Sequence, residues 1–221
     1  MGTPRRGPVL TAVAVGVAAV AAVVQYAVPS VVPVLERGPL DTGQWWRVVT
    51  PLLVQTLGWY QVVMNLVTLA VVGAVAEPLL GRWRWVVLFI VGTVGGQVAA
   101  YAWHEHGGGA SIAVCGLAGG LVAWLPHDRA GGNRWAEWVV VGYVAALTGW
   151  GFAGVPGTAV AVVVAAAVLA VAHRIALLGA VAAAAVLAVA SDLHGVSLVS
   201  GMVAGAVLTG LAARRPAPAA R

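Results

Sequence analysis

GGGASIAVCGLAGGLVAWL, residues 107–125, is the stretch that decides the fold class of this chain. Three glycines and an alanine lead to Ser111, and an apolar run follows. A polar group at the start of a membrane-embedded run is costly unless it serves a purpose. The stretch therefore predicts a membrane helix that begins at a functional serine. Comparable apolar stretches fall at 9–28, 59–76, 84–102, 137–153, 157–172, 175–190 and 195–212.

The composition agrees with a membrane protein. Of the 221 residues, 61% are hydrophobic and only 9% are charged, whereas soluble domains are about 25% charged. Runs such as 159–172 lack the alternating polar residues of a barrel strand. We therefore expect an all-α polytopic membrane protein of about eight hydrophobic segments, with a single transmembrane domain over residues 1–213 and a short basic cytoplasmic tail over 214–221.

The basic residues act as topology signals in this interpretation. All twelve are arginine, and no basic stripe interleaved with aromatic residues indicates nucleic-acid binding. If every stretch crosses, ten arginines fall on one side and two on the other, which predicts eight crossings with both termini cytoplasmic. The absence of lysine suggests GC-rich codon usage and thus a bacterial plasma membrane. The ten are Arg5, Arg6, Arg82, Arg84, Arg129, Arg134, Arg174, Arg214, Arg215 and Arg221; the two are Arg37 and Arg47.

Residues 157–190 decide whether the two halves of a site can meet. One straight helix over these 34 residues would be about 51 Å long, too long for the bilayer core. We therefore expect two short spans. Three crossings between Ser111 and His194 then place both residues near the outer face.

Ser111 and His194 are the candidate catalytic residues. A serine paired with a histidine is the minimum equipment for nucleophilic hydrolysis, and the free N–H groups at a helix start can stabilise an oxyanion. The alternatives are a serine that only caps a helix and a histidine at a helix end or interface. Asp192 lies two residues before His194, and on a helix that spacing would point its side chain elsewhere.

Gln61 and Asn65 lie four residues apart and share one helix face. Their amides could donate to an oxyanion, or they could form an ordinary interhelical hydrogen bond. The cluster His104-Glu105-His106 lacks further ligands for a metal site. With Cys115 as its single cysteine, the chain cannot form an internal disulfide. We expect Cys115 to be a small packing residue.

Several motifs together resemble those of the rhomboid family of intramembrane serine proteases. The similarity extends from about residue 46 to about residue 205. The matching motifs are Gln44-Trp45-Trp46-Arg47 in a long loop, Met64-Asn65 and Glu77 in the second segment, Gly109-Ala110-Ser111 with Gly116, and His194 with Gly201. The Trp residues of the loop also fit simple interfacial anchors.

The resemblance implies a rhomboid-like helical bundle with a six-helix core, to which this chain adds a pair of segments. It implies Ser111 as nucleophile, His194 as base and Asn65 as oxyanion donor, with Gln61 in the place of the family's histidine. It further implies cleavage of membrane-anchored substrates at their transmembrane segments, with no cofactor and no metal.

Three residues of the motifs depart from the family pattern. Gln61 stands where members carry histidine, Ile112 where they usually carry glycine, and Cys115 where they usually carry an aromatic residue. These departures keep an alternative open, namely an inactive rhomboid-like protein that binds transmembrane helices without cutting them. A transporter or channel would need more charged residues deep in the segments than the chain offers.

Overall fold

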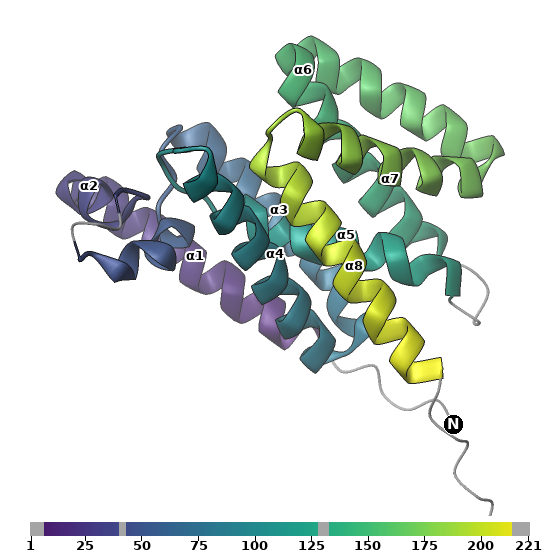
Figure 1. Ribbon diagram of the computed structural model, residues 1–221, viewed down its shortest axis with the longest axis horizontal. Helices are drawn as coiled ribbons and strands as arrows, with labels where there is room; N and C mark the ends of the chain where they lie inside the picture. The colour runs from purple at the N-terminus through teal and green to yellow at the C-terminus, as the bar shows by residue number, and fades with distance from the viewer. Residues whose placement is uncertain (1–6, 40–42, 128–132, 214–221) are drawn as a thin grey trace, which may run out of the picture.

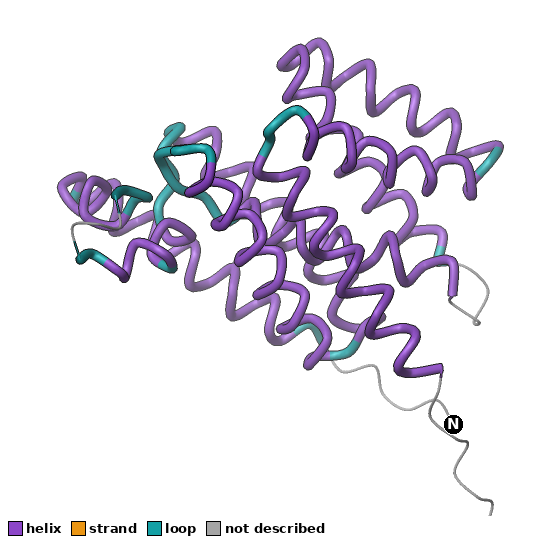
Figure 2. The backbone as a smooth tube through the Cα atoms, viewed as in Figure 1, coloured by secondary structure: helices purple, strands orange, loops and turns teal. Residues whose placement is uncertain are grey.

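The computed structural model describes residues 7–39, 43–127 and 133–213. Within them the chain is helical, and no strand is formed (Figures 1 and 2). This confirms the predicted all-α fold class. The tail 214–221 and the arginines at positions 5, 6, 129, 214, 215 and 221 lie outside the described residues. The main helices are α1 (Val9–Ala27), α3 (Trp59–Leu80), α4 (Arg82–Ala102), α5 (Ser111–Trp124), α6 (Arg134–Val171), α7 (His173–Val189) and α8 (Leu193–Ala213).

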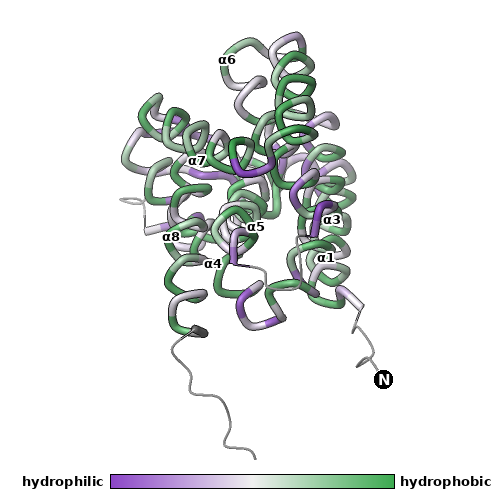
Figure 3. Tube along the Cα trace, turned by 90° about the vertical axis from the view of Figure 1, so that its right-hand side faces the viewer, coloured by the Kyte–Doolittle hydropathy of each residue, from purple (hydrophilic) through white to green (hydrophobic). Residues whose placement is uncertain are grey.

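Five of these helices, α1, α3, α4, α6 and α8, are long and apolar enough to cross a bilayer, and two shorter apolar helices accompany them. Their outer surfaces are rich in exposed valine, leucine and tryptophan. Figure 3 shows the same predominance of hydrophobic residues along the helices. Because exposing such an apolar surface to water is energetically unfavourable, the bundle is a multi-pass membrane domain.

Helix α5 is the centre of the bundle. Every residue from Ile112 to Val122 is buried, and Figure 3 shows α3, α4, α7 and α8 arranged around it. The most extensive packing is with α8. A helix enclosed in this way can hold its N-terminal residue, Ser111, at a fixed place inside the protein.

Glycines allow the backbone of α5 to pack directly against the backbones of α4 and α8. A Cβ atom at Gly92 of α4 would lie 2.3 Å from Cα of Gly116, and one at Gly201 of α8 would lie 2.3 Å from the Gly116 carbonyl oxygen. A Cβ at Gly119 would lie 2.1 Å from the Leu198 carbonyl oxygen. Close contact between small residues is the usual means of helix association in membranes. Here it fixes the separation of α5 and α8.

Helix α6 consists of two arms that fold back on each other. Ala153 and Gly154 leave the helical conformation, and Gly154 has a φ of 59°, which favours glycine. The arms touch where Gly149 meets Gly157, with a Cβ position only 2.3 Å from a carbonyl oxygen. Figure 1 shows the reversal, after which α7 runs back toward α8. Residues 157–190 thus form two helices separated at Ala172, as predicted.

Helix α1 is attached to α3 by a buried carboxylate. Glu77 is 3% exposed. It accepts hydrogen bonds from the backbone amides of Leu10 and Thr11 at 3.1 and 2.8 Å, and from the Thr11 hydroxyl at 3.0 Å. Arg82 lies 3.4 Å away. Charge-assisted bonds of this kind are stronger than neutral ones, so Glu77 holds one end of α1 in place.

The long segment between α1 and α3 folds into the short helix α2 (Val32–Leu35) and several single turns. Two arginines fix it. Arg37, 5% exposed, donates to the Gln97 side chain at 2.8 Å. Arg47 donates to the carbonyl oxygens of Glu36 and Pro33, each at 2.8 Å. The segment is therefore docked on α4 beside the loop that leads into Ser111.

Candidate active site

Ser111 and His194 lie side by side. Each stands in the first turn of its helix, Ser111 in α5 and His194 in α8. The Ser111 Oγ atom is 2.9 Å from His194 Nε2, a hydrogen-bond distance. The packing of α5 on α8 therefore brings together two residues that are 83 positions apart in the sequence.

Asp192 contacts the opposite side of the histidine ring, and our prediction that it points elsewhere is wrong. Its Oδ1 atom is 2.8 Å from His194 Nδ1. The prediction assumed that Asp192 belongs to the helix, but α8 begins at Leu193. The same Oδ1 accepts from the His194 backbone amide at 2.7 Å, as an N-cap residue does. Ser191, with a φ of 60°, forms the tight turn that precedes it.

Hydrogen bonding keeps the Asp192 carboxyl group ionised. Burial alone raises its pKa, but the His194 side chain and the backbone amides of His194 and Gly195 outweigh burial and leave the pKa below its usual value. An ionised carboxylate accepts a hydrogen bond and cannot donate one. The hydrogen between Asp192 and His194 is therefore carried by Nδ1 of the ring.

Gln61 and Asn65 converge on the loop before Ser111. The Gln61 amide donates to the Gly108 carbonyl oxygen at 2.9 Å. A Cβ atom at Gly109 would lie 2.6 Å from Gln61 Nε2 and 3.3 Å from Asn65 Nδ2. Only glycine leaves room for both amides next to this backbone. The predicted pair is thus placed two residues before the serine.

Two further glutamines complete this polar group, and the sequence reasoning missed both. Asn65 donates to the Gln55 side chain at 2.5 Å. The Gln55 backbone amide donates to Gln25 of α1, and Gln25 donates back to the Gln55 carbonyl oxygen at 2.8 Å. All three side chains are buried. Gln25 was the available signal, because it is the only polar residue of the run 19–28 apart from a tyrosine.

Two of the departures from the family pattern, Ile112 and Cys115, have a structural explanation. Ile112 is 1% exposed and faces α4, where Gly96 provides the space for its side chain. Cys115 is fully buried, as expected of a packing residue, and its sulfur lies 3.2 Å from the hydroxyl of Tyr143 on α6. A phenol group thus reaches position 115 from another helix.

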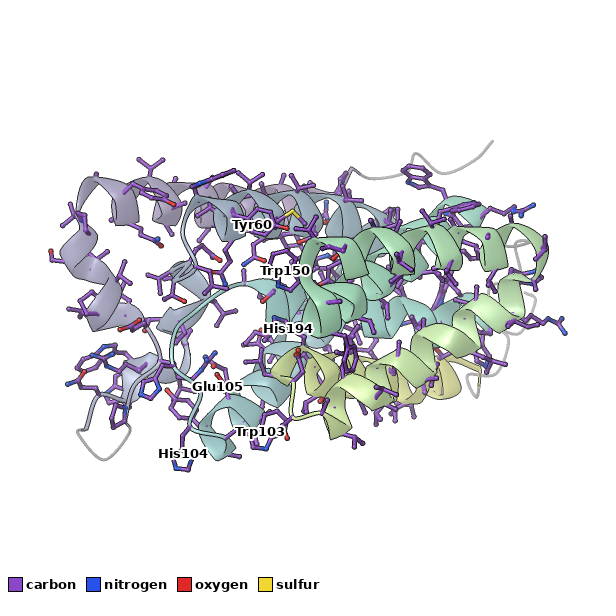
Figure 4. The ribbon with its side chains drawn as sticks, turned by 90° about the horizontal axis from the view of Figure 1, so that it is seen from above. Tyr60, Trp103, His104, Glu105, Trp150 and His194 are labelled. Atoms are coloured by element: carbon purple, nitrogen blue, oxygen red, sulfur yellow. The ribbon has the colours of Figure 1, made fainter. Side chains whose placement is uncertain are left out.

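An aromatic pair joins α3 and α6 near this site. Tyr60 and Trp150 stack with ring centroids 5.3 Å apart (Figure 4). Tyr60 precedes Gln61, and Trp150 precedes Gly151, whose Cβ position is 3.6 Å from Asp192 Oδ2. The stacked rings therefore bridge α3 and α6 at positions next to Gln61 and Gly151.

The cluster of histidines at 104 and 106 lies in the loop after α4. His104 has a φ of 57°, and Figure 4 places it at the edge of the molecule. Among the residues that the structure describes, no three His, Cys, Asp or Glu side chains are arranged to hold a metal ion.

Comparison with known proteins agrees with this architecture. The family model described as Rhomboid domain matches residues 42–190, more than half of the chain. The rhomboid protease GluP of Bacillus subtilis (strain 168) is 27% identical over 88 residues, which cover 39% of this chain and only 17% of that protein. No solved structure matches. Ser111 lies inside the matched region, while His194 lies just beyond it. The chain belongs to the rhomboid family of multi-pass membrane proteins.

Proposed function

We propose that this protein is an intramembrane serine endopeptidase that cleaves membrane-anchored protein substrates, in the plasma membrane of a bacterium. The observation that carries the proposal is the 2.9 Å contact between Ser111 Oγ and His194 Nε2 in a chain of the rhomboid family. A nucleophile within hydrogen-bond reach of a base is the requirement for acyl transfer.

The first half of the reaction forms an acyl-enzyme. Ser111 Oγ attacks the carbonyl carbon of the scissile peptide bond and gives its proton to His194 Nε2. The tetrahedral intermediate then collapses, the carbon–nitrogen bond breaks, and the leaving amine takes the proton from Nε2. The acyl group remains as an ester on Ser111.

The second half restores the enzyme. A water molecule gives a proton to His194 Nε2 as its oxygen attacks the ester carbonyl carbon. The bond to Ser111 Oγ breaks, the serine recovers the proton, and the substrate leaves as a carboxylic acid. The same imidazole thus acts as base and then as acid in each half.

Asn65 and Gln61 are the proposed oxyanion donors. Each side-chain amide has two N–H donors, and one from each is engaged, with Gln55 and Gly108 respectively. The second N–H of each group remains for the negatively charged oxygen, together with the free N–H groups at the start of α5. Removing one such donor typically slows acyl transfer about 10²–10³-fold.

Transmembrane segments are the proposed substrates. A helical substrate has its backbone groups hydrogen-bonded, and a peptide bond must be exposed before Ser111 can reach it. Small or helix-breaking residues near the cleavage position ease this local unwinding. No cofactor takes part in the proposed chemistry.

The test is labelling of the purified protein in detergent with a fluorophosphonate probe. The wild type should be labelled, and Ser111→Ala and His194→Ala should not be, with circular dichroism confirming that both variants are folded. An active rhomboid labelled in parallel validates the conditions. A folded wild type that stays unlabelled beside it would contradict the proposal and favour an inactive protein that binds transmembrane helices.

A further inference from the structure

Asp192 holds the ring nitrogen of His194 that faces away from Ser111. We propose that Asp192 is a positioning residue for catalysis, so that the protein works with a Ser111–His194–Asp192 triad. The inference rests on the endopeptidase function proposed above. It extends the serine–histidine pair by one carboxylate whose own contacts are with the histidine.

The two short contacts use the two different nitrogens of one imidazole ring. Nε2 lies 2.9 Å from Ser111 Oγ, and Nδ1 lies 2.8 Å from Asp192 Oδ1. A neutral imidazole carries one hydrogen, and a carboxylate at Nδ1 draws the hydrogen to that nitrogen. Nε2 is then left with a lone pair directed at the serine hydroxyl. This is the tautomer that a general base needs.

The carboxylate is itself held in place. Oδ1 accepts from the His194 backbone amide at 2.7 Å, and Oδ2 faces Gly151 of α6. The side chains of His194 and Asp192 are 29% and 28% exposed. Both are thus partly shielded from water, and a charge-assisted hydrogen bond is stronger there than in bulk solvent.

The surroundings of the pair contain few ionisable groups. Cys115 of α5 and Tyr143 of α6 interact electrostatically with Asp192, and Ser111 contacts the ring. The residues of α4 and α7 that contact the first turns of α8 include Gly95, Gly96, Leu187 and Ala188, and none of these four has an ionisable side chain. Among these neighbours, Asp192 is the residue whose carboxylate contacts the His194 ring.

During each acyl-transfer step His194 Nε2 receives a proton, and the ring becomes positively charged. The Asp192 carboxylate stabilises this imidazolium across Nδ1–H and stays ionised throughout. No further proton transfer is needed, so the atom balance of the proposed reaction is unchanged.

A purely structural role for Asp192 would be that of an N-cap, and substitutions can separate the two roles. Asparagine and serine both cap helices well. Asp192→Asn keeps an acceptor for the His194 amide but removes the charge. Asp192→Ser keeps a cap and removes both the charge and the reach to Nδ1. Glu105→Gln, at an exposed loop position, is the control for loss of one carboxylate elsewhere.

The measurement is the rate of fluorophosphonate labelling of the full-length protein from pH 5 to pH 9. We expect Asp192→Asn to lower the plateau rate about tenfold to a hundredfold, as loss of a hydrogen bond to a charged group implies, and Asp192→Ser to lower it further. Because Asp192→Asn keeps a cap for the start of α8, a role in capping alone predicts no loss of rate in this variant. Glu105→Gln should match the wild type.

If the wild type is labelled and both Asp192 variants are labelled at the same rate, the triad is overturned and the endopeptidase function still stands. If the wild type is not labelled, nitrogen-15 NMR of the His194 ring still decides the point. A downfield Nδ1–H proton that disappears in Asp192→Asn and Asp192→Ser supports the positioning role. An Nε2–H tautomer in the wild type refutes it.

Discussion

Substitution of Gly201 by alanine tests whether the glycine contacts between α5 and α8 position the reacting atoms. The added Cβ would lie 2.3 Å from the Gly116 carbonyl oxygen, whereas ordinary contact begins at 3.4 Å. Both partners of this contact belong to helix backbone, so no flexible side chain can move aside. The two helices must separate by about 1 Å, at an overpacking cost of about 1–3 kcal/mol.

The separation reaches the site because Ser111 and His194 begin the same two helices. Their 2.9 Å contact would lengthen to roughly 4 Å, which is beyond hydrogen-bond distance. A misplacement of about 1 Å can cost on the order of 10² in rate. We expect Gly201→Ala to label with a fluorophosphonate about a hundredfold more slowly than the wild type, while remaining helical in detergent.

Gly210 provides the matched control, since it lies on the same helix with no atom within 4 Å of its Cβ position. Gly210→Ala should label at the wild-type rate, and its unfolding temperature should be equal or higher because alanine favours helix. If Gly201→Ala labels as fast as Gly210→Ala, the reasoning that backbone contact sets the geometry of the dyad is refuted.

Three further outcomes follow from contacts described above. Replacing Tyr60 and Trp150 by alanine removes the stacked rings between α3 and α6. The labelling rate of a bulky fluorophosphonate should then rise several-fold relative to that of a small one. An unchanged ratio of these two rates would show that the rings do not restrict access to Ser111. Glu77→Ala removes three hydrogen bonds to α1, including that of the Thr11 hydroxyl, and should lower the free energy of unfolding by about 2–3 kcal/mol in a denaturation experiment, with Glu77→Gln losing less. Folding lowers the pKa of Asp192, so the ionised carboxylate stabilises the folded protein above pH of about 4. This stabilisation is lost as the pH falls through the pKa that Asp192 has in the folded protein. Melting temperatures should therefore fall less steeply below pH 4 in Asp192→Asn than in the wild type, and parallel curves would contradict the assignment.

The predictions that succeeded depend on local patterns and on chain length. Apolar runs separated by arginine-rich loops indicate helices, and a 34-residue run is too long for one span, which led to the correct division of residues 157–190. Ser111 and His194 were paired as polar residues at the starts of two apolar segments, and their side chains lie 2.9 Å apart. Each of these inferences needs only spacing along the chain.

The predictions that failed depend on the exact start of a helix and on contacts distant in sequence. The prediction applied helical spacing to residues 192–194, whereas α8 begins at Leu193 and Asp192 is a capping residue before it. Gln55 belongs to no periodic segment, and its contact with Gln25 exists only after α1 packs on the bundle. Periodicity carries no information about such contacts.

The contact of Ile112 with Gly96 means that positions 112 and 96 share one volume. A Cβ at Gly96 would lie 2.8 Å from Cβ of Ile112 and 2.3 Å from Oγ of Ser197. A larger residue at position 96 would therefore clash, and a smaller residue at position 112 would leave a void. Restoring glycine at 112 by itself would leave a hole between α4 and α5 and would not restore the family pattern. Among relatives, we expect glycine at the position of Ile112 to be accompanied by a larger side chain at the position of Gly96, so that the two substitutions are inherited as a pair.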